Sequence, residues 1–523
     1  MATVAEPARW ATEPFTTGTP EQFTRLREWL RRVHFTESEL CADAGVPTIA
    51  HFTSAEAGRK VFAEPADAVS LLVRLFFDGA RLPWSVVRGV LSHDELSILT
   101  DLGLLQPSVA DAAACAATVA LFPTEDLYLV SDRVAGLETV GMGLPADLVY
   151  TPLTKEARHY VAMMPRVECG DYLEMCAGTG IAALLAAKQF ARHAYSADIT
   201  ERCTRFARFN AALNGLENFT AVQGDLYEPV KGKTFDIIAA HPPYVPAEET
   251  AMVFRDGGAD GEQITRRIVA GVSEHLNPGG LFYLECMLTE RADDPIERRV
   301  RRMLGPLEDE FDVLVVRGAA AEAKAYLAER LASGHLSPEA FTRQSGLFRR
   351  SKIEWLVGVT TLIQRRTAAR PVITRHHTIG PDTRAEDVRW LLGYLSGTVE
   401  WGDEENRRLL DGRLRALPGT ELRTTSVLRD GAWVETGLTI ATSIPFSASS
   451  ACPAWFPRLL ARCDGRATVR DLLGWLRAEG AVPEAMTDDD FAGLIRELAD
   501  VPYVELDAYP LPERGSGNPP RVA

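Results

Sequence analysis

Between residues 172 and 244, four apolar runs are each followed by residues that could bind a ligand or take part in chemistry. The first run ends in a turn of small residues, the second and third end near Asp198 and Asp225, and the fourth ends in His241-Pro-Pro-Tyr244. If the runs are parallel strands, their carboxyl ends meet at one edge of a sheet, where open α/β sheets bind ligands. One aspartate alone is more often a helix cap or part of a solvated turn, but four signals in this order predict a binding crevice.

The first turn, CAGTG at residues 176–180, leads from the strand-like YLEM into an alanine-rich, helix-like segment. Small residues let the backbone approach a ligand, and a helix N-terminus offers free N–H groups. The turn lacks the Gly-Lys-Ser/Thr of a phosphate-binding Walker loop, and it matches the dinucleotide fingerprint G-x-G-x-x-G only loosely. The candidate cofactor-binding residues of this segment are Glu174, Cys176, Ala177, Gly178 and Gly180.

The two aspartates are candidates for further contacts to a nucleoside. Asp198, at the end of the strand-like YSAD, could accept hydrogen bonds from both hydroxyls of a ribose. Asp225, in VQGDLYEP, could accept one from an adenine amino group. Ile199 and Leu226, which follow the two acids, are assigned to the same cofactor-binding set.

The chain around these residues alternates strand-like and helix-like stretches, which predicts a parallel sheet with helices on both faces. We expect one doubly wound, seven-stranded α/β domain over residues 150–366. Its strands are expected at DYLEMC, HAYSAD, FTAVQGD, FDIIAA, LFYLECM, DVLVV and IEWLVGVTTLIQR. The helices expected between the earlier strands include IAALLAAKQFA and ERCTRFARFNAALNG.

Two smaller, mainly helical parts are expected to flank this domain. Residues 1–149 contain helical stretches and a predicted hairpin, ATVALFPTEDLYLVSDR, and residues 367–523 contain helices followed by a strand. Both parts have a winged-helix-like order of elements, which in so acidic a chain favours packing or dimerisation over DNA binding. His376 and His377 are expected in a loop before the third part, and the tail PLPERGSGNPPRVA is expected to be disordered.

Composition limits the function further. The chain of 523 residues has a formal charge of −16, which disfavours a large nucleic-acid footprint, because phosphate contacts require surplus Lys and Arg. Eight cysteines, without a CxxC pair or a zinc-like Cys/His cluster, predict a reduced, cytoplasmic setting and no metal site. Neither a membrane span of about 18 apolar residues nor a secretory leader is expected.

Together, these motifs resemble those of class I S-adenosylmethionine-dependent methyltransferases. LEMCAGTG resembles the first motif of that class, with Glu174 as its acid, ADIT resembles the second and GDLYEP the third. FDIIAAHPPY resembles the Asn-Pro-Pro-Tyr motif of the amino-methylating subgroup, above all of the glutamine N-methyltransferases that modify release factors and ribosomal proteins. The three-part layout resembles a group of actinobacterial methyltransferases of about this length. The resemblance implies S-adenosylmethionine as cofactor and a nitrogen of a protein, a peptide or a small metabolite as acceptor.

The resemblance assigns the catalytic roles to His241, Pro242, Pro243 and Tyr244. In the family motif, the Asn carboxamide and the first proline carbonyl accept both hydrogens of a planar NH₂ group, and the tyrosine stacks on the substrate. A neutral imidazole offers one acceptor nitrogen, but unlike Asn it can also take a proton. N-methylation therefore stays open beside O-methylation of a small acceptor with His241 as base, and beside a ring that only packs on the cofactor.

The stretch VFRDGGADGEQITRR, residues 253–267, directly follows this motif and contains three glycines, which predicts either a flexible lid over the crevice or an ordinary connecting loop. Two rival functions remain. One is a regulatory protein that binds the cofactor without catalysis. The other is an RNA base methyltransferase, which the acidic charge disfavours. A homodimer also stays open.

Overall fold

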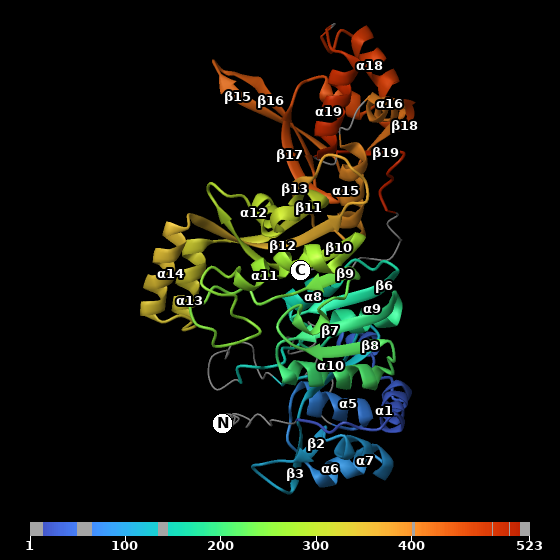
Figure 1. Ribbon diagram of the computed structural model, residues 1–523, viewed down its shortest axis with the longest axis vertical. Coiled ribbons are helices and arrows are strands. Elements are labelled where there is room, and N and C mark those ends of the chain that lie inside the picture. The colour runs from blue at the N-terminus through green and yellow to red at the C-terminus, as the bar shows by residue number, and fades with distance from the viewer. Residues whose placement is uncertain are drawn as a thin grey trace. The chain divides into compact units, whose positions relative to one another are not determined.

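The computed structural model describes residues 14–49, 65–133, 145–399, 403–483, 485–500 and 503–512 (Figure 1). The chain divides into two compact units. Unit 1 consists of Met1–Leu276, Glu285–Thr289 and Glu322–Glu354, and unit 2 consists of Asn277–Leu284, Glu290–Ala321 and Trp355–Ala523. The division into three domains at residues 150 and 366 stays a prediction.

Unit 1 contains a parallel sheet of the Rossmann-like type. Strands β6 (Cys169–Met175), β7 (Ala191–Asp198), β8 (Phe219–Gln223) and β9 (Phe235–Ala240) lie in the order β9-β6-β7-β8. The chain passes from β6 outward to β8 and then returns to the other side of β6. Met175, the last residue of β6, pairs with Ala197 of β7 and with Ala240 of β9. The segments that follow these strands are therefore neighbours at a switch point of the strand order, where α/β sheets bind ligands.

Helix α9 (Ile181–Gln189) connects β6 to β7 and α10 (Glu201–Asn214) connects β7 to β8, whereas α8 (Lys155–Met163) precedes β6 and α11 (Gln263–His275) follows β9 in the chain. α9 is buried from Ile181 to Ala187, which explains its apolar, alanine-rich sequence, because an enclosed helix needs no polar face. α10 begins at a Thr200 cap and ends at Gly215, whose φ of 68° closes the helix in the left-handed conformation. α9 and α10 confirm the two helices predicted from the sequence.

The N-terminal part of unit 1 is mainly helical. Its helices are α1 (Pro20–Arg32), α2 (Glu37–Ala44), α5 (Ala68–Leu72), a π-helical turn (Val73–Phe77), α6 (Trp84–Val90) and α7 (His93–Asp101). Strands β1 (Leu82–Pro83), β2 (Leu105–Pro107) and β3 (Ala114–Ala117) form an antiparallel sheet in the order β1-β3-β2. The winged-helix assignment of this part stays a prediction. None of the helices in the described ranges combines the length and the apolar character that crossing a bilayer requires.

The predicted hairpin is confirmed by β4 (Ala120–Thr124) and β5 (Leu127–Ser131), which pair antiparallel. Its turn residues, Glu125 and Asp126, have φ angles of 51° and 59°, as a tight two-residue hairpin turn requires.

Two asparagines of α10 bind the backbone of β5. The Asn210 amide accepts a hydrogen bond from the Val130 N–H at 2.8 Å and donates one to the Val130 carbonyl at 3.1 Å. Asn214 forms the same pair of bonds with Tyr128, at 2.9 and 2.7 Å. Since an uncovered strand edge leaves backbone groups without partners, these amides take the place of a further strand.

A helical hairpin, α13 (Ala323–Ala332) and α14 (Pro338–Arg350), also belongs to unit 1. It is held to the chain that follows β9. The Gln344 side chain donates to the Pro246 carbonyl at 2.7 Å, and Arg343 forms an ion pair with Glu248.

Seven further strands lie mainly in unit 2, although residues 276, 285–289, 322, 353 and 354 of these strands belong to unit 1. In the order β15-β16-β17-β13-β11-β12-β10, they are β15 (Glu421–Arg429), β16 (Ala432–Thr442), β17 (Phe446–Cys452), β13 (Thr374–Ile379), β11 (Phe311–Glu322), β12 (Ile353–Arg365) and β10 (Leu276–Arg291). Helix α12 (Ile296–Met303) lies between β10 and β11 in the chain. Each of the seven strands expected from the sequence coincides with a strand, but β13, β15, β16 and β17 extend the count beyond seven.

The placement of His376 and His377 in a loop is wrong. Both residues lie in β13, which pairs in parallel with β11 so that His376 is opposite Val315 and His377 opposite Val316. His377 is buried. Thr374, Thr378 and Ile379 of TRHHTI are β-branched and favour a strand, and pairing with β11 completes it.

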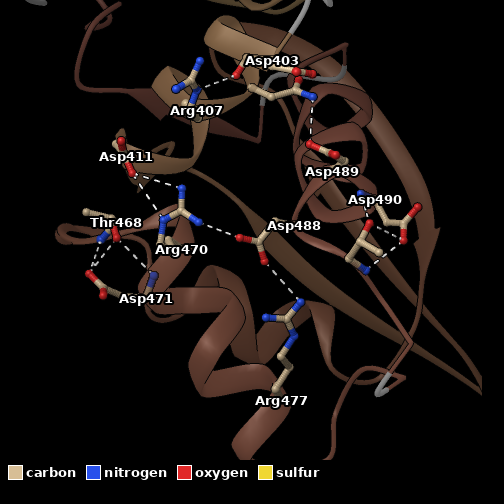
Figure 2. Close-up of polar contacts among 12 residues, drawn as sticks. Asp403, Arg407, Asp411, Thr468, Arg470, Asp471, Arg477, Asp488, Asp489 and Asp490 are labelled. Atoms are coloured by element: carbon tan, nitrogen blue, oxygen red, sulfur yellow. Dashed lines mark hydrogen bonds and ion pairs between the residues drawn. The ribbon is translucent and has the colours of Figure 1, made fainter.

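The C-terminal part of unit 2 combines helices with a small antiparallel sheet. The helices are α15 (Ala385–Thr398), α16 (Asp403–Asp411), α17 (Phe456–Leu460), α18 (Val469–Ala478) and α19 (Asp488–Asp500), and the sheet has the order β18 (Asp464–Thr468), β14 (Arg413–Ala416), β19 (Val504–Leu506). Figure 2 shows Arg470 of α18 between Asp411 and Asp488, at 3.4 and 2.6 Å, so one side chain joins three helices. The predicted helices followed by a strand are confirmed by α18, α19 and β19. The predicted disordered tail lies outside the described residues from position 513 onward.

Replacing Asn210 by leucine should destabilise unit 1 by about 2–3 kcal/mol, because the N–H and carbonyl of Val130 would lose their partners in a buried site. The loss would appear as a lower unfolding midpoint of the full chain in urea. Asn214→Leu, at the half-buried counterpart, should cost less, because water can replace its hydrogen bonds. Equal losses in the two variants would contradict this account.

Candidate active site

A cavity of about 640 Å³ opens at the carboxyl ends of β6, β7, β8 and β9 in unit 1. This volume lies in the range of sites that enclose small-molecule ligands. All of the predicted site residues except Gly180 line it, namely Glu174, Cys176, Ala177, Gly178, Asp198, Ile199, Asp225, Leu226, His241, Pro242, Pro243 and Tyr244. The structure therefore brings together residues that four separate segments of the sequence contribute.

The loop after β6 contains three residues in the left-handed region, Cys176 (φ 54°), Gly178 (54°) and Gly180 (79°). Glycine adopts this conformation without strain, whereas a cysteine in it is uncommon. Gly180 lies behind the loop, where an added Cβ would come within 3.1 Å of Ala207. No atom of the described residues would meet a Cβ on Gly178 within 4 Å, so a ligand can approach the backbone there. Burial and the nearby Asp198 raise the pKa of the Cys176 thiol, which stays protonated.

Glu174 joins the end of β6 to the start of α9. Its carboxylate accepts hydrogen bonds from the N–H groups of Ala182 (3.3 Å) and Ala183 (2.8 Å), and the Tyr160 hydroxyl lies 3.5 Å away. The helix N-terminus favours the ionised carboxylate. However, the side chain is only 2% exposed, and burial raises the pKa of Glu174 to about 8. Both oxygens are engaged by the protein, so Glu174 acts on the loop by fixing its position.

Asp198 connects the first two loops of the site. One carboxylate oxygen accepts from the Gly178 N–H at 3.0 Å, and the other accepts from the N–H and the hydroxyl of Thr200 at 3.0 and 3.2 Å. A carboxylate has about four acceptor positions, so one remains for a ligand on the oxygen bound to Gly178. Ile199 lines the cavity next to it with 52% of its surface exposed, which offers an apolar contact for a flat ring.

Asp225 forms an ion pair that the sequence did not reveal. Its Oδ2 lies 2.6 Å from the guanidinium of Arg267 in α11, and the Arg267 pKa is raised by this hydrogen bond. Oδ1 is left as an acceptor. Leu226, with φ of 53°, turns the chain immediately afterwards. This geometry provides one carboxylate oxygen and an apolar side chain at the cavity wall.

The ring of His241 is fixed on two sides. Its Nδ1 lies 2.8 Å from the carbonyl oxygen of Glu285. Because a carbonyl can only accept, Nδ1 carries the proton, and the neutral ring keeps the Nε2 lone pair as an acceptor. The ring also stacks on Tyr160, with centroids 5.2 Å apart and planes at 19°. Burial lowers the pKa of His241, so the imidazole is neutral at pH 7.

The backbone after His241 packs against Gly257. A Cβ on Gly257 would lie 2.7 Å from the Pro243 carbonyl oxygen and 2.8 Å from the Tyr244 Cα, so only glycine fits there. The ring of Tyr244 meets that of His241 edge to face, at 5.7 Å. Tight packing therefore adds to the two prolines in fixing the direction of this segment.

Residues 253–267, predicted as either a flexible lid or an ordinary connecting loop, form backbone hydrogen bonds with the chain that follows Tyr244. The Val245 N–H donates to the Arg255 carbonyl, and the Gly257 N–H donates to the Val245 carbonyl, each at 2.9 Å. From Gln263 onward, the segment belongs to α11. It borders the cavity through residues 253–256, Ile264 and Arg267, and its glycines allow close approach and tight turns.

Several cavity residues carry no motif that a sequence could reveal. They are the stacked pair Tyr150 and Phe254, Glu156 of α8, Arg267, Arg330 of α13, and His335 after it. The last two come from the α13–α14 hairpin, which only the tertiary fold brings to this cavity. Among the residues that the structure describes, the buried Nε of Arg330 has no hydrogen-bond partner, whereas Arg255 and Arg267 are each paired with an aspartate.

Residues 153–303 match the family model of the methyltransferase small domain. The chain is 37% identical over 121 residues to the ribosomal protein uL3 glutamine methyltransferase of Bradyrhizobium diazoefficiens, a match that covers 21% of this chain and 38% of that protein. It is 31% identical over 125 residues to the release factor glutamine methyltransferase of Thermodesulfovibrio yellowstonii, covering 22% and 45%. Among solved structures, it is similar to a methyltransferase from Pyrococcus furiosus, with 20% identity, a TM-score of 0.27, and coverage of 42% of this chain and 88% of that one.

The chain spans between 38% and 60% of the length of the first three curated relatives. The family match and these relatives support a class I methyltransferase with S-adenosylmethionine as cofactor over residues 153–303. The donor set fits that cofactor, because carboxylates suit a ribose and a cationic sulfonium, and exposed apolar side chains suit an adenine ring.

Glu174→Gln should change how stability depends on pH. In the folded protein the carboxyl group has a pKa of about 8, against 4.5 when exposed, so between these values the native state holds a proton that the unfolded chain releases. The wild-type free energy of unfolding should therefore fall from pH 5 to pH 8 relative to that of the uncharged variant. Urea unfolding of both proteins across this range measures the difference. A constant difference would mean that the α9 N-terminus keeps Glu174 ionised.

Proposed function

We propose that this protein transfers a methyl group from S-adenosylmethionine to a nitrogen of a protein or peptide. The observation that carries this proposal is the His241-Pro-Pro-Tyr244 segment at the end of β9, where the Glu285 carbonyl holds Nδ1 and leaves Nε2 as an acceptor. The curated relatives are named for methylating a glutamine of release factors or of ribosomal protein uL3, which supports a protein nitrogen as the acceptor.

The acceptor nitrogen must present its lone pair in line with the departing sulfur. The cofactor supplies an electrophilic methyl group. In the proposed arrangement, Nε2 of His241 accepts one N–H of the acceptor, and the Pro242 carbonyl accepts the other. This turns the nitrogen lone pair toward the methyl group. Tyr244 provides an aromatic face that tolerates a nearby cation.

The proposed cofactor contacts follow the order of the strands. The backbone at Gly178 approaches the cofactor, the free acceptor position of Asp198 binds the ribose, and Oδ1 of Asp225 binds the adenine amino group. Ile199 and Leu226 enclose the base. Glu174 fixes the loop after β6 through its hydrogen bonds to the first turn of α9.

The proposed acceptor side is formed by Glu156 and by the α13–α14 hairpin with Arg330 and His335. These residues add polar contacts beyond the reacting nitrogen, as recognition of a peptide requires. The N-terminal part and the C-terminal part carry no cavity residue with a chemical motif, so we assign them to acceptor choice or dimerisation.

O-methylation is the second candidate, and one observation favours it. Burial lowers the pKa of His241 and keeps its ring neutral, as a general base for a hydroxyl must be before it takes the proton. Asparagine cannot act as a general base, so the substitution His241→Asn distinguishes O-methylation from N-methylation.

Asp198→Ala should weaken the binding of S-adenosylmethionine by about 1–3 kcal/mol, or roughly 5- to 150-fold, because the ribose loses a charged acceptor and the Gly178 N–H loses its partner. Isothermal titration calorimetry measures this. Asp236→Ala is the matched control, since Asp236 binds the N–H groups of Gly170 and Asp171 at the amino end of β6 and does not line the cavity. Unchanged affinity in Asp198→Ala would remove Asp198 from the site.

His241→Ala should lower the rate of methyl transfer by about 10²- to 10⁴-fold, and His241→Asn should retain most of the rate if the acceptor is a planar nitrogen. Because the folded pKa of His241 lies below 6.5, the wild-type rate should decline only below that pH. Transfer of a labelled methyl group from the cofactor to proteins of a cell extract, followed by mass spectrometry of the labelled product, provides the measurement.

His275→Asn is the matched control for the histidine. His275 also bonds a carbonyl through Nδ1 and stacks on a tyrosine, Tyr227, but it does not line the cavity. Its substitution should leave the rate unchanged. A large loss of the methyl-transfer rate in His241→Asn would favour a hydroxyl acceptor. A normal rate in His241→Ala would reject a role for His241 in both N-methylation and O-methylation.

A further inference from the structure

β15 and β16 form a long antiparallel hairpin in unit 2, with β15 at the edge of the sheet (Figure 1). Every residue of β15 is exposed, and the hairpin presents Leu422, Leu428 and Trp433 to solvent, Trp433 with 73% of its surface. Residues 438–442 of β16 pair with β17, and beyond them the hairpin is a two-stranded ribbon. Such a ribbon has little stability of its own in water, and an uncovered edge strand is open to pairing. Within the described part of the chain, no strand pairs with the outer edge of β15. A partner strand would complete this element.

The direction of the backbone groups of β15 can be assigned. The Thr425 carbonyl accepts a hydrogen bond from the Thr436 hydroxyl of β16 at 3.2 Å, so Thr425 turns its backbone polar groups toward β16. Since these groups alternate in direction along a strand, Thr424 and Ser426 turn their N–H and carbonyl groups outward. By the same alternation, the N–H and carbonyl groups of Leu422 and Leu428 also point away from β16.

The β15 sequence, ELRTTSVLR, is complementary to itself when two copies are aligned antiparallel about Thr425. Glu421 then faces the partner's Arg429, Leu422 the partner's Leu428, Thr424 the partner's Ser426, and Thr425 its own counterpart. Arg423 faces the partner's Val427, so this pair alone is not matched in character. The outward-turned residues lie opposite one another in this register, which is the condition for hydrogen-bonded antiparallel pairs. A shift by one residue would separate the charges and oppose groups that point away from each other.

We propose that two copies of this chain pair through β15, antiparallel and centred on Thr425, to form a two-fold symmetric dimer. Opposite charges then meet at both ends of the pair, and leucines and threonines pair between them, as favourable cross-strand contacts require. Leu422, Leu428 and Trp433 lie on one face of the hairpin by their register, so each copy extends the apolar surface of the other. A single self-complementary patch satisfies the requirement of a closed, isologous interface. The pairing is independent of the methyl-transfer chemistry in unit 1.

Sedimentation velocity of the full chain over a range of concentrations tests the proposal. The wild-type protein should reach twice the 57.3 kDa of one chain. Glu421→Arg and Arg429→Glu should each raise the dimer dissociation constant about 10-fold, because two attractive pairs become repulsive. The double variant should restore wild-type dimerisation, because the opposite charges meet again with their positions exchanged.

Glu435→Arg is the matched control, since it makes the same charge change on β16, opposite Ser426 and away from the outer edge. It should leave the dissociation constant unchanged. Ser426→Pro should abolish the dimer by removing an outward N–H, while circular dichroism shows an intact fold. If the wild-type protein sediments as a monomer at all concentrations, the proposal is overturned, and the partner of β15 would be a strand of another protein. A dimer dissociation constant that the single charge reversals leave unchanged, or that the double variant does not restore, would overturn it as well.

Discussion

The parallel register of β6 between β7 and β9 is the constraint on which the site depends. Met175 pairs with Ala197 on one side and Ala240 on the other, so the residues that follow three strands leave the sheet at the same level. Asp198 then reaches the Gly178 N–H, and His241 comes within stacking distance of Tyr160, whose hydroxyl approaches Glu174. A shift of one residue in either pairing would reverse the faces of these side chains and separate the cofactor loop from the acceptor motif.

The cofactor loop is fixed at a cost in stability. Glu174 is buried beneath it with a raised pKa, and Cys176 has a backbone conformation that non-glycine residues rarely adopt. Such features persist only where surrounding contacts determine them, and here α9, Asp198 and Tyr160 supply those contacts. The benefit is a loop whose N–H groups already point in fixed directions, so less ordering remains to be done when a ligand binds.

How much of the protein the sequence could predict depends on the range of the interactions. The strands, α9, α10 and the β4–β5 hairpin were predictable, because apolar periodicity and local turn chemistry specify them. The candidate site residues could be brought together from the sequence because each lies at the end of a strand or shortly after it. Arg267 and Arg330 could not be found, because α11 and α13 reach the cavity only through tertiary packing. β13 and the β15–β16 hairpin were missed although they contain β-branched residues, because few of their side chains are buried and pairing with neighbouring strands defines them.

The histidine in the acceptor motif changes what the site can do. A carboxamide offers an oxygen with two lone pairs, but His241 uses Nδ1 to bind the Glu285 carbonyl and keeps a single acceptor at Nε2. An NH₂ group therefore needs a second acceptor, and the segment fixed by two prolines and by the close contact with Gly257 holds the Pro242 carbonyl in a defined direction. The tautomer is set by a backbone carbonyl rather than by a carboxylate, and burial lowers the pKa of His241 because it outweighs the Glu285 carbonyl and the charge of Glu156, which both favour the protonated ring. The ring is thus a weak base and a well-oriented hydrogen-bond acceptor, which suits positioning a nitrogen better than removing a proton from a hydroxyl.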